Sequence, residues 1–255
     1  MNDLGSRYDR FHAWPAWNRL FGDSGFRNLG LWPEGTRSPE EAAGHLLERL
    51  VGGLPVPDRI LDVACGPGAT TAWLAGRHPG ADLVGVDLSE GGLARARERV
   101  PAARFLPMDA GALDFPDGSF DLVVCVEAAC HFPSRARFLA EARRVLRPGG
   151  HLAVADLLFH AYPGKMAPVF PDRTCYPEPG PYLDLYRRAG FAPVDHEDVL
   201  GLTVAPFCRH AGNWALGERL RGRLNEDGLR RLLGMVAKIR ALPAASYPLV
   251  RAAAP

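Results

Sequence analysis

The sequence predicts an α/β protein whose core is a parallel β-sheet. Short apolar runs alternate with helical patterns through the middle of the chain, as is typical when helices connect parallel strands. The first apolar run ends in a glycine turn, Cys65-Gly66-Pro67-Gly68, which leads into a helix. Asp87 lies at the end of the second run, 19 residues after Gly68 (87 − 68 = 19). These observations together indicate a sheet that binds a ligand at one edge.

Residues 1–58 are predicted to form an N-terminal helical cap segment, because their pattern is helical but interrupted by prolines. An aromatic-rich apolar stripe runs along the beginning of this segment, comprising Tyr8, Phe11, Trp14, Trp17, Leu20 and Phe21. Ser38 precedes Pro39-Glu40-Glu41, an arrangement that predicts a helix N-cap followed by proline in the first turn. This helix is expected to end before Gly52-Gly53.

Five strands are expected in order, near residues 59–64, 82–86, 103–107, 120–126 and 150–156. The first is a short apolar run bounded by turn-forming residues, which is typical of a strand buried on both faces. Ser134 is predicted to cap a helix that continues to Arg144, and Pro148-Gly149-Gly150 is predicted to precede the fifth strand. Helices are expected between consecutive strands.

The chain after the fifth strand is predicted to be more irregular. Residues 157–180 are rich in proline and aromatic residues and are expected to form an ordered loop. The later elements are predicted as a helix at Leu183–Ala189, a strand at Phe191–Val199, helices at Leu216–Leu224 and Asp227–Leu242, and a last strand at Ser246–Ala252. Residues 59–255 are therefore expected to form one domain.

Composition narrows the class of protein. A chain of 255 residues is long enough for one large α/β domain. Its net charge of +1 shows no excess of basic residues of the kind expected in a protein that binds nucleic acid. The five cysteines show no C-x-x-C spacing, which predicts free thiols in a reducing cytoplasm. The sequence shows neither an apolar signal region nor a run near the ~20 apolar residues of a membrane span. We therefore expect a cytoplasmic protein with no nucleic-acid or membrane partner.

The glycine turn and Asp87 indicate a nucleoside ligand. Gly66 and Gly68 let the backbone approach a ligand closely, and an acid about 20 residues later commonly binds the ribose hydroxyls. A dinucleotide motif requires a glycine or small residue where Thr71 stands. Asp62, just before the turn, suits a ligand that carries an ammonium group. S-adenosylmethionine (SAM) carries ribose, adenine and an α-amino acid tail.

Four segments carry a family resemblance in the right order: DVACGPGATT, VGVDLS, FLPMDAGALDFPDGSFDLVVCVEAACHF and RVLRPGGHLAVADLL. From about Arg59 to Leu158 the chain resembles class I SAM-dependent methyltransferases, especially bacterial O-methyltransferases of sugars, polyketides and secondary metabolites. The resemblance implies a Rossmann-like, mostly parallel seven-stranded sheet with the last strand antiparallel and helices on both faces. It also implies a helical lid, with insertions near 157–182 and 206–242, and a role in antibiotic biosynthesis.

The resemblance assigns the cofactor contacts residue by residue. The methionine end falls to Asp62, Ala64, Gly66 and Gly68, the ribose to Asp87, and the adenine to Leu88, Asp109 and Ala110. Glu127 opens the loop after the fourth strand and is a further candidate for contact with the cofactor or substrate. Trp32, in the segment Asn28–Trp32, is a candidate contact as well as a candidate core residue, and Tyr8 is a candidate cover for the methionine end. No metal is expected, because no acidic cluster with an asparagine is evident near Asp156.

His131 is the candidate general base. It follows the fourth strand at the edge where ligands bind in open α/β sheets, and its unperturbed pKa of ~6.5 suits removal of a hydroxyl proton. Asp156 ends the fifth strand at the same edge and is predicted to orient His131. Histidine and aspartate at these positions match a pattern in sugar and secondary-metabolite O-methyltransferases. The expected reaction is methyl transfer to a hydroxyl or enol oxygen of a small hydrophobic or glycosylated molecule.

Alternative functions remain open from sequence. Carbon or nitrogen methylation of a small molecule would use an aromatic-lined site, for which the candidates are Phe159, Tyr162, Phe170, Tyr176, Tyr182 and Trp214. An NAD-dependent oxidoreductase is disfavoured by Thr71 and Asp62, and a non-catalytic nucleoside-binding module by His131. The oligomeric state, monomer or homodimer, is likewise open, because the aromatic stripe near the N-terminus fits either its own core or a partner subunit.

Overall fold

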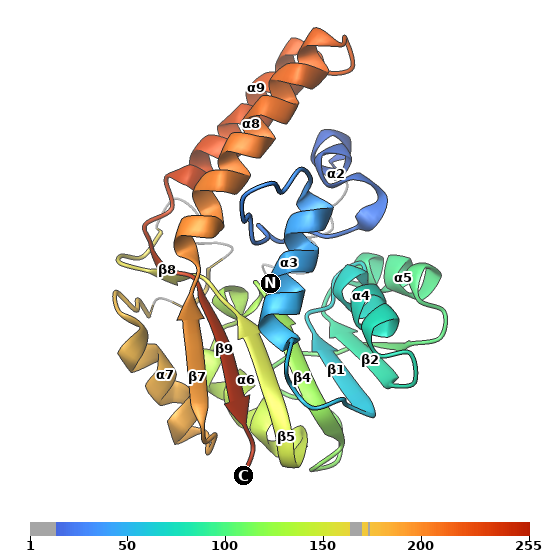
Figure 1. Cartoon of the computed structure of the whole chain (residues 1–255), viewed down its shortest axis with the longest axis vertical. Helices are drawn as coiled ribbons and strands as arrows, with labels where there is room; N and C mark the ends of the chain where they lie inside the picture. The colour runs from blue at the N-terminus through green and yellow to red at the C-terminus, as the bar shows by residue number, and fades with distance from the viewer. Residues whose placement is uncertain (1–13, 164–169, 173) are drawn as a thin grey trace.

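The structure is a computed structural model that describes residues 14–163, 170–172 and 174–255. The predictions made for Tyr8 and Phe11 lie outside the described residues. Figure 1 shows a twisted sheet flanked by helices, with a long helical hairpin projecting from one end.

One seven-stranded sheet forms the centre of the described part of the chain, in the order β3-β2-β1-β4-β5-β9-β7. Its strands are β1 (Arg59–Val63), β2 (Asp82–Asp87), β3 (Arg104–Pro107), β4 (Phe120–Val126), β5 (Leu146–Ala155), β7 (Val194–Asp198) and β9 (Pro248–Ala253). The first five strands pair in parallel, whereas β9 runs antiparallel to both β5 and β7. The predicted fold class, including the antiparallel last strand, is confirmed.

Helices cover both faces of the sheet, as predicted. They are α3 (Pro39–Val51), α4 (Ala69–Arg77), α5 (Glu90–Arg99), α6 (Arg135–Val145) and α7 (Pro179–Arg188). Buried side chains of α6 and α7 pack with Leu61 and Val63 in one core layer. Side chains of α3 and α4 pack with Ile60 in the layer on the opposite face. Because neighbouring side chains of β1 point to opposite faces, both layers are apolar and the strand is buried on both sides.

Two predicted helix caps are confirmed. The Ser38 hydroxyl accepts a hydrogen bond from the backbone N–H of Glu41 at 3.1 Å. The Ser134 hydroxyl accepts one from the N–H of Arg137 at 3.3 Å. The prediction for the start of the fifth strand is wrong, since β5 begins at Leu146 and includes Pro148-Gly149-Gly150. This segment stays extended because Gly149 and Gly150 exchange backbone hydrogen bonds with Ala254 near the C-terminus.

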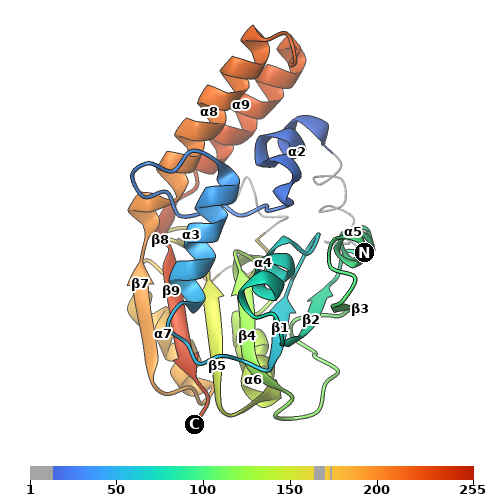
Figure 2. The ribbon, with the colours of Figure 1, turned by 45° about the vertical axis from the view of Figure 1, so that its right-hand side comes forward.

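The C-terminal helices differ from prediction. α8 spans Val204–Leu220 and α9 spans Glu226–Arg240, so the first of the two begins 12 residues before the predicted start at Leu216 (216 − 204 = 12). Its first half contains proline and glycine, which hid its helical spacing of buried Phe207, Cys208 and Ala211. Figures 1 and 2 show α8 and α9 as a hairpin that extends away from the sheet. An unpredicted two-stranded sheet, β6 (Leu158–Phe159) with β8 (Ala244–Ser246), lies at its base.

The beginning of the described chain packs against this hairpin. The short helix α2 (Pro15–Phe21) places Trp17 and Phe21 against Phe207 of α8, with ring centroids 6.2 and 5.9 Å apart. The described part of the aromatic stripe therefore contributes to the core of its own chain. After α2 and the turn η1 (Gly22–Ser24), residues 25–32 run toward α3; we call them the N-terminal strap.

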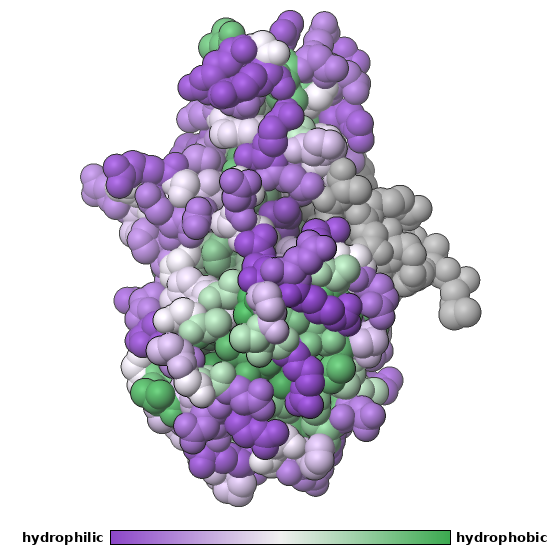
Figure 3. Space-filling view, turned by 90° about the vertical axis from the view of Figure 1, so that its right-hand side faces the viewer, coloured by the Kyte–Doolittle hydropathy of each residue, from purple (hydrophilic) through white to green (hydrophobic). Residues whose placement is uncertain are grey.

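The molecular surface in Figure 3 is hydrophilic over most of the projecting hairpin and carries an apolar area lower down. Within the described residues, none of the helices combines the length and the hydropathy that a membrane crossing requires.

Candidate cofactor and active site

A cavity of about 460 Å³ opens at the carboxyl ends of the central strands. This volume is within the ~300–1,000 Å³ typical of small-molecule sites. The loops after β1, β2, β3 and β4 contribute to its wall, as do the N-terminal strap, Trp17 of α2, and Met235 and Ile239 of α9. Elements from both ends of the chain therefore meet the sheet edge at one site.

The glycine turn forms one wall of the cavity. Ala64 has a φ of +59° and Gly66 a φ of +52°, so the backbone turns sharply after β1 and both residues line the cavity. Gly68 does not line it. A Cβ at Gly68 would lie 2.9 Å from the Cα of Ala96, so glycine there permits close packing of the turn against α5.

Asp87 and Leu88 lie on the next part of the wall. The Asp87 carboxylate accepts hydrogen bonds from the backbone N–H groups of Gly66 and Ser89, both at 2.8 Å. It thereby fixes the end of β2 to the glycine turn. Leu88 is 51% exposed, which leaves its side chain available to pack on a flat ring. Both predicted ribose and adenine residues are thus at the cavity.

Asp62 has a partner within the protein. It is 2% exposed and accepts a 2.6 Å hydrogen bond from the Thr71 hydroxyl. Burial raises the pKa of the Asp62 carboxyl to about 7. Asp62 is absent from the described residues that line the cavity. The two residues that distinguish this turn from a dinucleotide motif therefore bind each other and hold the start of α4 against β1.

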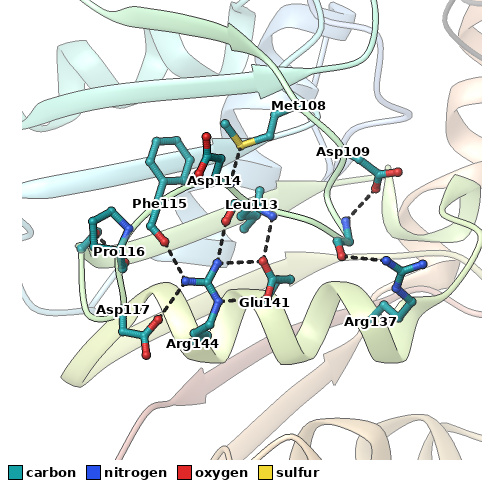
Figure 4. A network of polar contacts seen from close by, with 12 residues as sticks. Met108, Asp109, Leu113, Asp114, Phe115, Pro116, Asp117, Arg137, Glu141 and Arg144 are labelled. Atoms are coloured by element: carbon teal, nitrogen blue, oxygen red, sulfur yellow. Dashed lines mark hydrogen bonds and ion pairs between the residues drawn. The ribbon is translucent and has the colours of Figure 1, made fainter.

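Asp109 and Ala110 line the cavity from the loop after β3. Figure 4 shows how α6 holds this loop. Arg144 donates to the carbonyl oxygens of Leu113 and Phe115, both at 2.6 Å, and Glu141 accepts from the N–H of Leu113 at 2.7 Å. These contacts fix the position of the predicted adenine-binding residues.

Glu127 connects three separate parts of the chain. Its backbone has a φ of +51°, unusual for a residue with a side chain. Its carboxylate oxygen Oε1 accepts hydrogen bonds from the N–H of Leu29 at 2.7 Å and from the hydroxyl of Tyr247 at 2.5 Å. Burial raises the pKa of Glu127 to about 7. Glu127 lines the cavity, but its described bonds go to the N-terminal strap and to the residue before β9.

His131 ends the short turn η2 (Ala129–His131) and lines the main cavity. Its ring stacks on Phe170 with centroids 4.9 Å apart. His131 also lines a second cavity, of about 120 Å³, whose wall includes Cys130, Leu157 and Leu242. The wall residues Leu29, Glu127, His131 and Ile239 belong to both cavities. His131 therefore stands at the boundary between a large space and a smaller, apolar one.

Asp156 is fully buried behind this boundary. Its oxygen Oδ2 accepts from Arg135 Nε at 2.8 Å, and Oδ1 accepts from the N–H of Leu157 at 2.8 Å. The structure thus pairs the Asp156 carboxylate with Arg135, not with His131 as predicted, and Asp156 is not among the described wall residues. Sequence reasoning missed Arg135, which the rule that buried carboxylates need a cationic partner would have suggested.

Other predicted contacts also lie elsewhere. Trp32 is buried, donates from Nε1 to the carbonyl of Leu29 at 2.7 Å and contacts the ring of His210 of α8 in a tilted arrangement, so it is a core residue. Of the aromatic residues proposed for a cation cage, Phe170 alone appears among the described residues of either wall. Wall residues that the sequence did not reveal include Trp17, Arg27, Asn28, Met108, Phe132 and Met235. Within the described ranges, no three His, Cys, Asp or Glu side chains gather as a metal site.

A mixed seven-stranded sheet with this order, a glycine turn after β1 and an acid at the end of β2 define a Rossmann-like protein of the methyltransferase type. Comparison with known proteins supports this class. Residues 61–154 match the family described as "Methyltransferase domain". The 27-O-demethylrifamycin SV methyltransferase of Amycolatopsis mediterranei (strain S699) is 32% identical over 249 residues, which cover 91% of this chain and 86% of that protein.

Methyltransferase GfsG of Streptomyces halstedii is 35% identical over 166 residues, 61% of this chain and 58% of that protein. Among solved structures, the cyclase SpnF has a TM-score of 0.79 at 24% identity, covering 100% of this chain and 96% of that chain. The cyclopropane synthase MmaA2 from Mycobacterium tuberculosis has a TM-score of 0.76 at 19% identity, covering 98% and 97%. These two structures support the fold.

The chain belongs to the class I SAM-dependent methyltransferases. SAM is therefore the cofactor, and NAD, which the sequence left as an alternative, is not.

Proposed function

We propose that this enzyme transfers the methyl group of SAM to a hydroxyl or enol oxygen of a small natural product, with His131 as general base. The position of His131 carries the proposal, because it lies on the wall shared by the main and the smaller cavity. The cofactor-side residues Asp87, Asp109 and Ala110 lie in the main cavity only. In the proposal, the cofactor occupies the main cavity and the reacting part of the acceptor meets His131 from the side of the smaller one.

The chemistry requires few groups. Methyl transfer from a sulfonium is an in-line displacement that depends mainly on positioning. An alcohol becomes a good nucleophile when its proton is removed, and an imidazole with a pKa near neutrality does this efficiently. Phe170 fixes the ring of His131 by stacking. In the proposed reaction, His131 would accept the hydroxyl proton as the acceptor oxygen takes the methyl group, and the bond from that carbon to sulfur would break to release S-adenosylhomocysteine.

Asp156 takes the role of a positioning residue in this proposal. Its ion pair with Arg135 joins the end of β5 to the first residue of α6. The loop that carries His131 lies between β4 and α6, so this buried ion pair anchors one end of the loop. Arg135 is also within 3.5 Å of Asp172, close to Phe170 in sequence. Asp156 would thus influence His131 through the protein framework.

The acceptor is proposed to be a hydrophobic or glycosylated small molecule. Apolar side chains, including Leu157, Ile239 and Leu242, dominate the smaller cavity. The name of the Amycolatopsis relative places its missing methyl on an oxygen, which supports oxygen as the target here. Trp17 and α9 line the main cavity and Phe170 lines the smaller one. The described parts of the N-terminal cap segment (1–58) and of the lid insertions near 157–182 and 206–242 are therefore proposed to cover the acceptor.

Substitution of His131 tests the base. For His131→Ala we expect kcat to fall by about 10²–10⁴-fold, while the Kd for S-adenosylhomocysteine stays within about twofold. Turnover can be measured with 27-O-demethylrifamycin SV as the first acceptor of a panel of hydroxylated polyketides and glycosides. His196→Ala, an exposed change on β7, is the matched control.

The position of the new methyl group decides between the alternatives. A product methylated on carbon or nitrogen would contradict the proposal, as would an unchanged kcat for His131→Ala at saturating acceptor. Carbon methylation through a stabilised cation predicts instead that Phe170→Leu, at the wall of the smaller cavity, lowers kcat more than His131→Ala does. NMR of the isolated product identifies the methylated atom.

A further inference from the structure

The α-amino acid end of SAM needs polar partners that the predicted residues do not all supply. This end carries a carboxylate and an ammonium group. Asp62, the residue predicted for the ammonium, is bonded to Thr71 and is not on the described wall of the cavity. Gly66 remains on the wall, but its N–H is already donated to Asp87. Other polar side chains on the wall are therefore the candidates for these partners.

Arg27 and Asn28 of the N-terminal strap lie on that wall and both carry an unsatisfied polar atom. Arg27 donates from Nη1 to the carbonyl of Phe26 at 2.5 Å and from Nη2 to Asn18 Oδ1 at 3.0 Å. Its Nε–H is buried and has no hydrogen-bond partner in the structure. Asn28 is 7% exposed, and its Oδ1 is likewise buried without a partner. Buried polar atoms are nearly always satisfied in folded proteins, so a missing ligand is the natural explanation.

Charge at this position points to an anion. Burial, together with the positive charges of Arg95 and Arg99, lowers the pKa of Arg27 to about 10, which leaves Arg27 charged at neutral pH. In the part of the chain that the structure describes, none of these arginines forms an ion pair with a carboxylate. Three like charges without a counter-ion favour a bound carboxylate.

One of these three arginines, Arg99, is also hydrogen-bonded to the glycine turn after β1. Arg99 donates from Nε to the carbonyl of Pro67 in the glycine turn at 3.1 Å, and from Nη1 to the carbonyl of Asp23 at 3.2 Å. Arg99 therefore holds the chain just before the strap against the turn that approaches the methionine end. Glu127 holds the strap again at Leu29. Arg27 and Asn28 lie between these two attachments.

We propose that Arg27 and Asn28 form the subsite for the zwitterionic α-amino acid end of the methyl donor. The guanidinium of Arg27 binds the carboxylate, and the side-chain oxygen of Asn28 accepts a hydrogen bond from the ammonium. One unsatisfied donor and one unsatisfied acceptor on adjacent residues match the two charges of this group. The proposal rests on the methyl donor alone and is independent of the acceptor atom and of His131.

Isothermal titration with three ligands tests it on the full chain. S-adenosylhomocysteine carries both charges, its decarboxylated analogue carries only the ammonium, and methylthioadenosine carries neither. For Arg27→Gln we expect the Kd for S-adenosylhomocysteine to rise at least about tenfold, and the Kd for the other two ligands to change less than about twofold. Arg27→Lys keeps the charge and should recover part of the loss. Arg37→Gln, at an 86% exposed side chain beside Glu41, is the matched control.

Asn28→Leu provides the second arm. It should weaken S-adenosylhomocysteine and its decarboxylated analogue several-fold, and leave methylthioadenosine unchanged. Binding of methylthioadenosine reports that the nucleoside part of the site is intact, so a misfolded variant is recognised. Equal weakening of all three ligands by Arg27→Gln would mean that Arg27 only supports the strap, and unchanged binding of all three would mean that it has no role. Either result overturns the proposal.

Discussion

At the scale of single residues, two buried carboxyl groups hold parts of the site together and take no part in the proposed reaction. Asp62 holds Thr71 at the start of α4, and Glu127 holds Leu29 of the strap and Tyr247. Burial raises the pKa of both carboxyls to about 7. A raised pKa keeps these groups protonated in the folded protein at pH values where the unfolded chain has lost the proton, and this difference makes folding sensitive to pH.

The sign of this sensitivity follows from the raised pKa of Asp62. Between its ordinary value of 3.8 and the folded value of about 7, the folded protein retains a proton that the unfolded chain releases. Stability from this group is therefore lost as the pH rises through this window, by at most about 1.4 kcal/mol per pH unit. Asp62→Asn should make the free energy of unfolding fall less steeply between pH 5 and pH 7, as measured by urea denaturation.

The exposed Asp195→Asn is the control for this experiment. Its unfolding free energy should follow that of the unmodified protein across the whole pH range. If Asp62→Asn and Asp195→Asn gave parallel curves, the raised pKa of Asp62 would be refuted.

At the scale of elements, α6 does more than cover the sheet. Its first residue, Arg135, binds Asp156 behind the His131 loop. Its last turns carry Glu141 and Arg144, which hold the loop after β3. One helix thereby anchors both the loop assigned to adenine and the loop that carries the proposed base. Figure 4 shows the contacts of Glu141 and Arg144 with the loop after β3.

Removing the Arg144 side chain should loosen the loop after β3, which carries the predicted adenine-binding residues Asp109 and Ala110. Its guanidinium donates to the carbonyls of Leu113 and Phe115 and pairs with Asp117 at 2.9 Å. For Arg144→Ala we expect the Kd for S-adenosylhomocysteine to rise about three- to tenfold, because Asp109 and Ala110 lose their fixed position. The free energy of unfolding should fall by about 1–2 kcal/mol. Isothermal titration and urea denaturation measure the two effects.

A neighbouring arginine on the same helix separates the loop effect from a general effect on α6. Arg143 donates to the carbonyls of Gly190 and Pro255, away from the cavity. Arg143→Ala should leave the Kd for S-adenosylhomocysteine within about twofold. Equal Kd values for the Arg143 and Arg144 variants would show that the adenine loop does not depend on its anchor.

At the scale of the whole molecule, the cavity joins segments that are far apart in the chain. Trp17 and the strap meet Met235 and Ile239 over the ends of β1, β2 and β4. The strap is joined to the sheet through Glu127, and α2 is joined to α8 through Phe207. The wall of the cavity therefore includes residues of both α2 and α9, the first and the last helices of the described chain.

Cofactor binding should consequently stabilise distant segments together. With S-adenosylhomocysteine at 100 times its Kd, global stability should rise by about 2.7 kcal/mol. Hydrogen exchange should slow in residues 25–31, 64–70, 108–111 and 235–239, which line or adjoin the cavity. The helix α7 packs on α6 at the other end of the sheet. Hydrogen exchange in α7 should slow by no more than the rise in global stability accounts for. Protection limited to residues 64–70 would contradict a site shared by both ends of the chain.

The fold by itself does not determine the reaction. Structures of similar fold include proteins described as a cyclase and as a cyclopropane synthase, and unrelated functions are common on one fold. In the proposed function, the reaction is set by a few side chains that line the smaller cavity, among them His131 and Phe170. Product analysis tests this proposal directly.

Most of the sheet could be predicted from the sequence. β4 spans the predicted residues, and β1, β2 and β3 agree to within one residue at each end. Buried parallel strands are short, apolar and bounded by turn residues, so their signal is local. The helix α8 was predicted too short because its glycine and proline residues obscure the periodicity, and its contacts with α2 and α9 stabilise it regardless.

The sequence by itself determined the sheet, the glycine turn and the methyl donor, because each depends on residue types at short, fixed spacings. Tertiary structure decided which side chains reach the cavity. In the folded chain, Asp62 is hydrogen-bonded to Thr71 and Asp156 to Arg135. Trp32 lies in the core, and the N-terminal strap and α9 line the site. These outcomes depend on contacts between residues far apart in the chain, such as Trp17 and Phe207, which are separated by 190 positions (207 − 17 = 190), and no local pattern encodes them.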